Sequence, residues 1–219
     1  GGNVFEHPDL IPFLENLKKQ KVIANITVHQ VHFMQNLELI KKLQEEKLIY
    51  GIGVSVSAPT EELIKALKSV PNTVCHVING IWNEKVAETM ADRNLKVLIL
   101  GYKELRRGNE YIAAHDGIVA DNKKWLYNNL EKLIKRFKLI SFDNLAIEQL
   151  NVKRLLSDAE WEEFYQGDDG TSTFYIDAIN QKFARSSTAA FDKRYPIDNL
   201  SMDEMFKIIT DEYRKEKKK

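Results

Sequence analysis

The stretch IYGIGVSV, residues 49–56, has the length and apolar character of a buried β-strand, and it decides the fold class of this chain. An amphipathic helical pattern at 37–48 precedes it, and a further strand-like run at 22–28 precedes that helix. The same alternation continues, with strands predicted at 73–78, 96–100 and 139–142. A regular strand–helix beat is typical of parallel strands joined by crossover helices, so the sequence predicts an α/β protein with a parallel sheet.

The strand pattern leaves the curvature of that sheet open. Five strands with right-handed crossovers form either an open doubly wound sheet or most of a (β/α) barrel. Beyond residue 143 the alternation stops. Two capping-box patterns start helices at Ser157 and Ser201, and the runs 173–178 and 182–185 predict an antiparallel hairpin. The predicted organisation is a partial β/α barrel at 1–143 and a C-terminal extension with helices and a β-hairpin at 144–219.

Net charge, hydrophobicity and cysteine content exclude several classes of protein. Lysine plus arginine and aspartate plus glutamate each total 32, so no net charge attracts the chain to nucleic acid or to an anionic membrane. No apolar run approaches the roughly 18 residues of a membrane span, and no signal segment opens the chain, so we expect a soluble, cytoplasmic protein. Cys75 is the only cysteine, which excludes a disulfide and a complete cysteine ligand set within this sequence. Nothing in the sequence indicates the oligomeric state.

Polar side chains follow the predicted strands at their carboxyl ends, where β/α proteins bind ligands. The candidates for the substrate side of such a site are Thr27, His29, Lys103, Asp143, Asn144 and Gln149. Strand termination and helix capping explain any single one of these residues equally well. Taken together, their hydroxyl and amide groups favour a ligand with a ribose and an amino-acid moiety.

The first ten residues, GGNVFEHPDL, carry a resemblance to a known family. They resemble the Gly-Gly-Glu-Pro loop of radical S-adenosylmethionine (SAM) enzymes, which binds the amino group of SAM and continues into a helix. The likeness extends to about residue 103 and implies a partial (β/α) barrel of the radical SAM type, with Gly1, Gly2 and Asn3 at the cofactor. Asn3 stands where the family has glutamate, so its contact should lack the charge-assisted part of that hydrogen bond. An opening Gly-Gly without methionine also leads us to expect a chain truncated upstream.

The resemblance implies further cofactor contacts and an activity. Ser55 and Ser57 match positions that contact the ribose or carboxylate of SAM, Asn79 matches another polar strand end, and Leu100 lies in the strand that flanks the adenine. The implied function is a radical SAM enzyme whose intact form uses a 4Fe-4S cluster and SAM to generate a 5′-deoxyadenosyl radical and modify a substrate. That substrate, a peptide, a nucleotide or a small metabolite, is not identified by the sequence.

The family's Cys-x3-Cys-x2-Cys loop is absent, which is the main departure from its pattern. These cluster ligands are expected upstream of Gly1, so the chain alone should be inactive.

Two alternatives stay open: a non-catalytic barrel that binds or scaffolds without a cluster, and a barrel metallohydrolase with zinc on His29 and His32, which Asp143 is placed to join.

Overall fold

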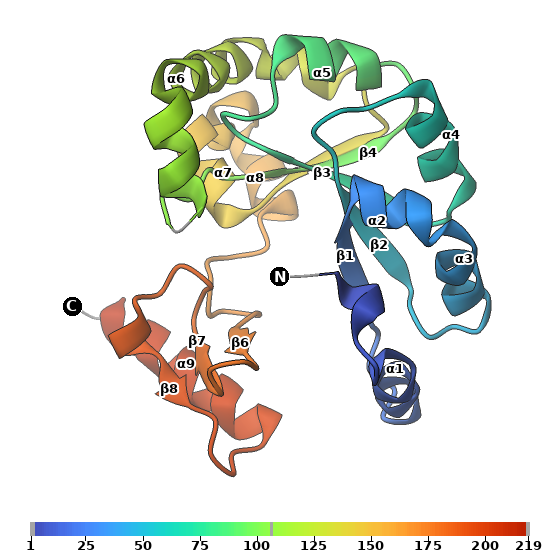
Figure 1. Ribbon diagram of the computed structural model, residues 1–219. Coiled ribbons are helices and arrows are strands. Elements are labelled where there is room, and N and C mark those ends of the chain that lie inside the picture. Colours follow the sequence, from blue (N-terminus) through green and yellow to red (C-terminus); the bar gives the residue numbers. More distant parts are fainter. Residues whose placement is uncertain (1–2, 106, 218–219) are drawn as a thin grey trace. The chain divides into compact units, whose positions relative to one another are not determined.

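The structure is a computed structural model that describes residues 3–105 and 107–217 (Figure 1). The chain divides into two compact units, Gly1–Val152 and Lys153–Lys219, each of which is described by itself. The first unit includes the helix after the fifth strand, which was expected to belong to the extension. None of the helices in the described ranges combines the length and the apolar character needed to cross a bilayer.

The first unit is built on one five-stranded sheet in which every neighbouring pair is parallel. Its strands are β1 (Asn25–His29), β2 (Gly51–Ser55), β3 (Thr73–Ile78), β4 (Lys96–Leu100) and β5 (Leu139–Phe142). The α/β class and the parallel sheet are therefore confirmed. The spatial order β1-β2-β3-β4-β5 follows the chain without the reversal of a doubly wound sheet. Because β1 and β5 do not pair with each other, the sheet is open and is not a closed barrel.

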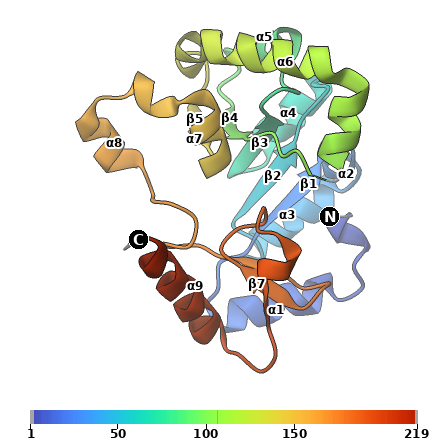
Figure 2. The same ribbon diagram turned by 90° about the vertical axis from the view of Figure 1, so that its left-hand side faces the viewer.

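Seven α-helices of the described ranges accompany this sheet. They are α1 (Leu10–Lys19), α2 (Gln30–Gln35), α3 (Leu37–Glu45), α4 (Glu61–Ser69), α5 (Glu84–Met90), α6 (Arg107–Ile134) and α7 (Asn144–Leu150), with a short 3-10 turn, Val4–Glu6, before α1. In the ribbon views α4, α5 and α6 lie along one side of the sheet (Figures 1 and 2). An unreversed strand order with right-handed crossovers requires this one-sided arrangement.

Several boundaries differ from the predictions, as for β2, which spans Gly51–Ser55 where 49–56 was predicted. The strand predicted at 22–28 begins only at Asn25, because Lys21 takes a left-handed backbone (φ 59°) after α1 and the next residues lead into the sheet. The long helix α6 spans Arg107–Ile134 and has a non-helical residue, His115, inside it. Two helical segments therefore meet at a kink at His115.

The two faces of the sheet differ in chemistry because side chains alternate along each strand. One face buries apolar pairs such as Ile26 with Ile52 and Val28 with Val54. Burial of each such side chain contributes about 1.5–3 kcal/mol of stability. The opposite face carries Thr27, which is exposed, and other polar groups described below. One face of the sheet is thus buried and apolar, and the other carries polar groups such as Thr27, Ser55 and His76.

The second unit contains α8 (Asp158–Phe164), a short antiparallel sheet and α9 (Met202–Glu216). Both predicted capping boxes are present, at Ser157 and Ser201, and so is the predicted hairpin. That hairpin is β6 (Tyr175–Asp177) and β7 (Lys182–Ala184), to which the two-residue β8 (Tyr195–Pro196) adds a third strand. Phe183, Met205 and Ile209 form its core.

Candidate functional site

A small cavity lies at the carboxyl ends of the middle strands of the first unit. Its volume is about 150 Å³, and His29, Ser55, Ser57 and Leu100, all predicted as site residues, line it. His76 and Trp82, which were not predicted, line it as well. Four candidates from three strands are therefore brought together at the edge where the ligand was expected.

Strand register explains the polar part of this lining. His29 on β1 is the register partner of Ser55 on β2, and Ser55 is the partner of His76 on β3. Partners in a parallel sheet point to the same face, so an imidazole, a hydroxyl and a second imidazole form one row. His29 also caps α2, because its Nδ1 accepts from the Val31 N–H at 3.3 Å. That hydrogen bond places the ring proton on Nε2.

The absence of a side chain at Gly53 leaves room for the His76 ring. A Cβ on Gly53 would lie 2.5 Å from Nε2 of His76 and 2.8 Å from Oγ1 of Thr27, so the ring lies over the glycine and beside Thr27. Burial lowers the pKa of His76 below its ordinary value of 6.5. His76 is therefore neutral at pH 7, with one nitrogen as donor and the other as acceptor. Strict alternation along 73–78 would have placed it on the polar face with Ser55.

Gln30 holds the loop that presents Ser57. Its Oε1 accepts from the backbone N–H of Ser57 at 2.8 Å and of Ala58 at 3.1 Å, while its Nε2 donates to the Ala58 carbonyl at 3.0 Å. The opposite wall has Trp82, whose side chain is almost fully buried and whose Nε1 has no hydrogen-bond partner among the described residues. A buried donor without a partner costs about 1–3 kcal/mol.

Three other candidates are engaged in structural bonds at the β3–β5 side of the same edge. Gln149 accepts from Asn79 Nδ2 at 3.0 Å and from the Tyr102 N–H at 2.8 Å, and it donates to the Tyr102 carbonyl at 2.9 Å. Asp143 accepts from the backbone N–H of Gly101 and of Ala146, both at 2.8 Å. Asn79, Asp143 and Gln149 therefore fasten α7 to the strand ends, and we call this set the α7 latch.

The remaining predicted residues lie apart from the cavity. Asn3 caps the first 3-10 turn, accepting from the Phe5 N–H at 3.2 Å and donating to Glu6 at 3.1 Å. Lys103 is exposed in the loop after β4, and Asn144 is the first residue of α7. Gly1 and Gly2, predicted as cofactor contacts, lie outside the described residues.

The metal-ligand candidates are only partly brought together. The rings of His29 and His32 are 6.4 Å apart between centroids. Asp143 follows β5, at the other edge of the sheet from β1, the strand that ends at His29. Within 3–105 and 107–217, no group of three or more His, Cys, Asp and Glu side chains is arranged to hold a metal ion. Burial raises the pKa of the Cys75 thiol to about 12, which keeps it protonated.

Comparison of the chain with family models, with curated proteins and with solved structures finds no match in any of the three.

Proposed function

We propose that this chain is the SAM-binding part of a radical SAM enzyme, with the cofactor at the carboxyl ends of β2, β3 and β4. The observation that carries this proposal is the shared cavity. Ser55, Ser57 and Leu100 were each expected at the cofactor, and all three line the same cavity. The unreversed strand order also supports a barrel segment over a doubly wound sheet.

The lining fits part of SAM. The hydroxyls of Ser55 and Ser57 suit the ribose hydroxyls or the carboxylate, and the apolar side chains of Ile78, Ile81 and Leu100 suit the faces of an adenine. A cavity of about 150 Å³ is smaller than the roughly 300–1,000 Å³ of complete small-molecule sites, so it holds only a portion of the cofactor.

The cluster does not fit the residues of this chain. Three thiolates are required, whereas the sequence contains one cysteine, and burial inside β3 raises the pKa of that thiol to about 12. The proposal therefore requires cluster ligands from residues outside this sequence. Bound next to such a cluster, SAM would supply radical chemistry, and the residues of this chain would hold SAM in place.

The residues of this chain would bind the cofactor and orient it toward the substrate. Ser55 and Ser57 would donate to the cofactor, and Gln30 would hold the Ser57 loop in place. Neutral His76, beside Thr27 on the polar face, would accept or donate one hydrogen bond from the substrate side.

Binding tests the proposal without any turnover. We expect isothermal titration of the chain with S-adenosylhomocysteine to give saturable binding, which Ser55→Ala with Ser57→Ala weakens about tenfold through the loss of two hydrogen bonds. Ser69→Ala, at the other end of the sheet, is the matched control and should leave the affinity unchanged. Absence of binding, or equal loss in the control, would refute the assignment of the cavity.

Catalysis is tested with any coding sequence that precedes Gly1. An in-frame Cys-x3-Cys-x2-Cys loop, visible absorbance after anaerobic reconstitution and reductant-dependent 5′-deoxyadenosine would support the enzymatic function. SAM-analogue binding by a protein without such a loop would instead favour the non-catalytic alternative.

A further inference from the structure

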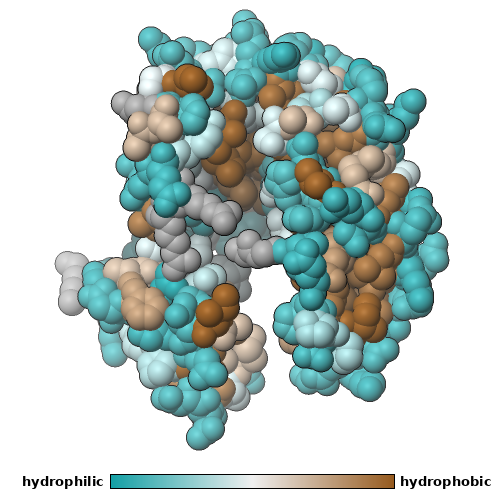
Figure 3. All heavy atoms as spheres, viewed as in Figure 1, coloured by the Kyte–Doolittle hydropathy of each residue, from teal (hydrophilic) through white to brown (hydrophobic). Residues whose placement is uncertain are grey.

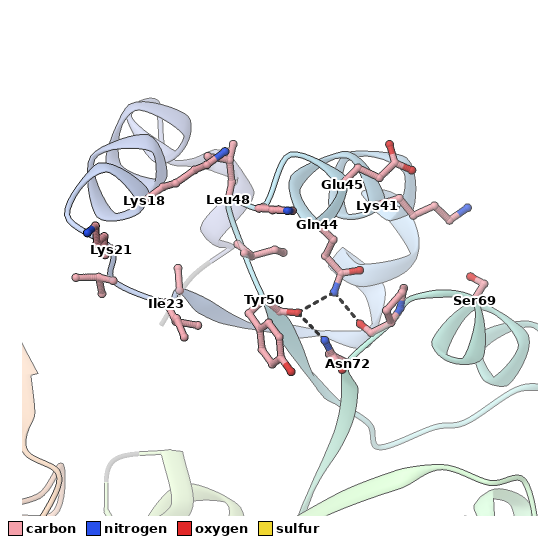
Figure 4. A pocket seen from close by; sticks show the side chains of 15 residues that line it. Lys18, Lys21, Ile23, Lys41, Gln44, Glu45, Leu48, Tyr50, Ser69 and Asn72 are labelled. Carbon is pink, nitrogen blue, oxygen red and sulfur yellow. Dashed lines mark hydrogen bonds between the residues drawn. The ribbon is translucent and has the colours of Figure 1, made fainter.

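A second and larger cavity lies at the amino ends of the strands, away from the proposed cofactor edge. Its volume is about 820 Å³, within the roughly 300–1,000 Å³ of small-molecule sites. Segments before β1, β2 and β3 and the ends of α1 and α3 form its walls (Figure 4). We infer that this cavity binds a small anionic ligand with an apolar body, which is independent of the proposed SAM site.

The walls are apolar to an extent unusual for a surface. Ile23 is 73% exposed, Tyr50 63% and Val22 49%, and all three line the cavity. In the space-filling view apolar residues gather on the surface between α1 and α3 (Figure 3). Gathered exposed apolar residues of this kind mark binding surfaces, whereas scattered ones do not.

The charges of the lining favour an anion. Lys18, Lys21, Lys41 and Lys47 line the cavity, against one carboxylate, Glu45. Two of these lysines have protein partners, because Lys18 donates to the Glu46 carbonyl at 2.7 Å and Lys41 pairs with Glu38 at 2.7 Å. The side-chain ammonium groups of Lys21 and Lys47 have neither a hydrogen bond nor an ion pair among the described residues.

An ordinary structural role explains Lys18 better than it explains Lys21 and Lys47. Cations in the last turn of a helix interact favourably with its dipole, and Lys18 lies in the last turn of α1. Lys21 and Lys47 lie beyond the ends of α1 and α3, with left-handed φ of 59° and 55°. Glycine or asparagine is usual there, and another residue costs about 1–2 kcal/mol. Asn72 occupies the equivalent place after α4. Two lysines at unfavourable positions beside one apolar cavity point to a ligand.

Gln44 defines the floor of the cavity. Its Nε2 donates to the Pro71 carbonyl at 2.7 Å and to the Tyr50 carbonyl at 3.4 Å, and Asn72 donates to the same Tyr50 carbonyl at 3.2 Å (Figure 4). These bonds fix the amide, so its buried Oε1 remains an acceptor without a partner in the described part of the chain.

Two fluorescent probes with the same ring system test the inference on the full chain. The first is 8-anilinonaphthalene-1-sulfonate, which has an anion, an apolar body and an N–H. The second is N-phenyl-1-naphthylamine, which lacks the sulfonate. We expect one anionic probe per chain, bound about tenfold more tightly than the neutral one.

The key variant combines Lys21→Gly and Lys47→Gly. Glycine removes both charges and also relieves the left-handed backbone, so the protein should be no less stable than the parent. Affinity for the sulfonate probe should fall about tenfold while affinity for the neutral probe stays the same. Lys65→Ala with Lys85→Ala, two exposed lysines on α4 and α5, is the matched control and should change neither affinity.

Three results would overturn the inference: no binding of the sulfonate probe, equal affinities for the two probes, or equal loss in the control variant. Ile23→Ser gives a separate check, since it should weaken both probes at a position that is too exposed to unfold the protein. Failure here would leave the proposed SAM site untouched, because the two sites share no residue.

Discussion

Replacement of Gln149 by alanine should loosen the α7 latch and destabilise the first unit. The change removes three hydrogen bonds, to Asn79 Nδ2 and to the N–H and carbonyl of Tyr102. Asn79 is 1% exposed, so water cannot easily replace the lost partner of its side chain. A net hydrogen bond contributes about 1 kcal/mol and a buried group left unpaired costs about 1–3 kcal/mol, so we expect a loss of about 2–4 kcal/mol in the free energy of unfolding.

Urea unfolding followed by circular dichroism measures this loss, and amide hydrogen exchange localises it. Protection of the Tyr102 amide should fall with the stability, since that amide donates to Gln149. Glu148→Ala, at the exposed neighbouring position on α7, is the control and should change stability by less than about 0.5 kcal/mol. A double variant with Asn79→Ala should cost less than the sum of the single changes, because the two side chains share a bond. A loss below about 0.5 kcal/mol for Gln149→Ala would show that the latch is not structural.

Three further predictions concern the polar face and the second unit. Gly53→Ala should displace the His76 ring, because the new Cβ would lie 2.3 Å from its Cε1. Nuclear magnetic resonance should then show shifted His76 ring signals and a changed pKa of His76. Unchanged ring signals would contradict the contact. Because the pKa of His76 is lowered in the folded state, the unfolded state binds more protons below pH 6.5. The free energy of unfolding should therefore fall as the pH drops from about 6.5. In the His76→Gln variant, the urea midpoint should fall less steeply over that range. Arg194→Met should destabilise the second unit by about 3–5 kcal/mol in thermal unfolding. Arg194 lies 2.8 Å from Asp177, whose side chain is 8% exposed, so the variant would keep a buried carboxylate without its counter-ion. A change below about 1 kcal/mol would contradict this prediction.

The alternation of strand-like and helical segments was sufficient to predict the parallel sheet, because parallel strands need crossover connections that are usually helices. β3, β4 and β5 have the predicted bounds, whereas β1 begins later than expected because a lysine takes a left-handed conformation that its residue type does not announce. Strand order and the open edge depend on contacts between distant segments, which periodicity does not encode.

The sequence predicted at which edge of the sheet the candidate residues lie, but not which of them line a cavity and which make structural hydrogen bonds. Ser55 and Ser57 line a cavity, whereas Asn79, Asp143 and Gln149 lie at the same edge and are engaged in the α7 latch. Polar residues at a strand end look alike in sequence whether they face a ligand or a neighbouring helix. His76 was missed for the opposite reason, since an imidazole inside a strand looks structural until the register places it beside Ser55.

The consecutive strand order determines where the first unit begins to unfold. Each strand in a sheet ordered β1-β2-β3-β4-β5 pairs only with the strands before and after it in the chain, as repeats do in a solenoid. Stability is then close to a sum of nearest-neighbour interfaces, and β1 and β5 have one such interface where β2, β3 and β4 have two. Unfolding should therefore begin by fraying at the two ends of the series, with the central strands exchanging their amide protons last.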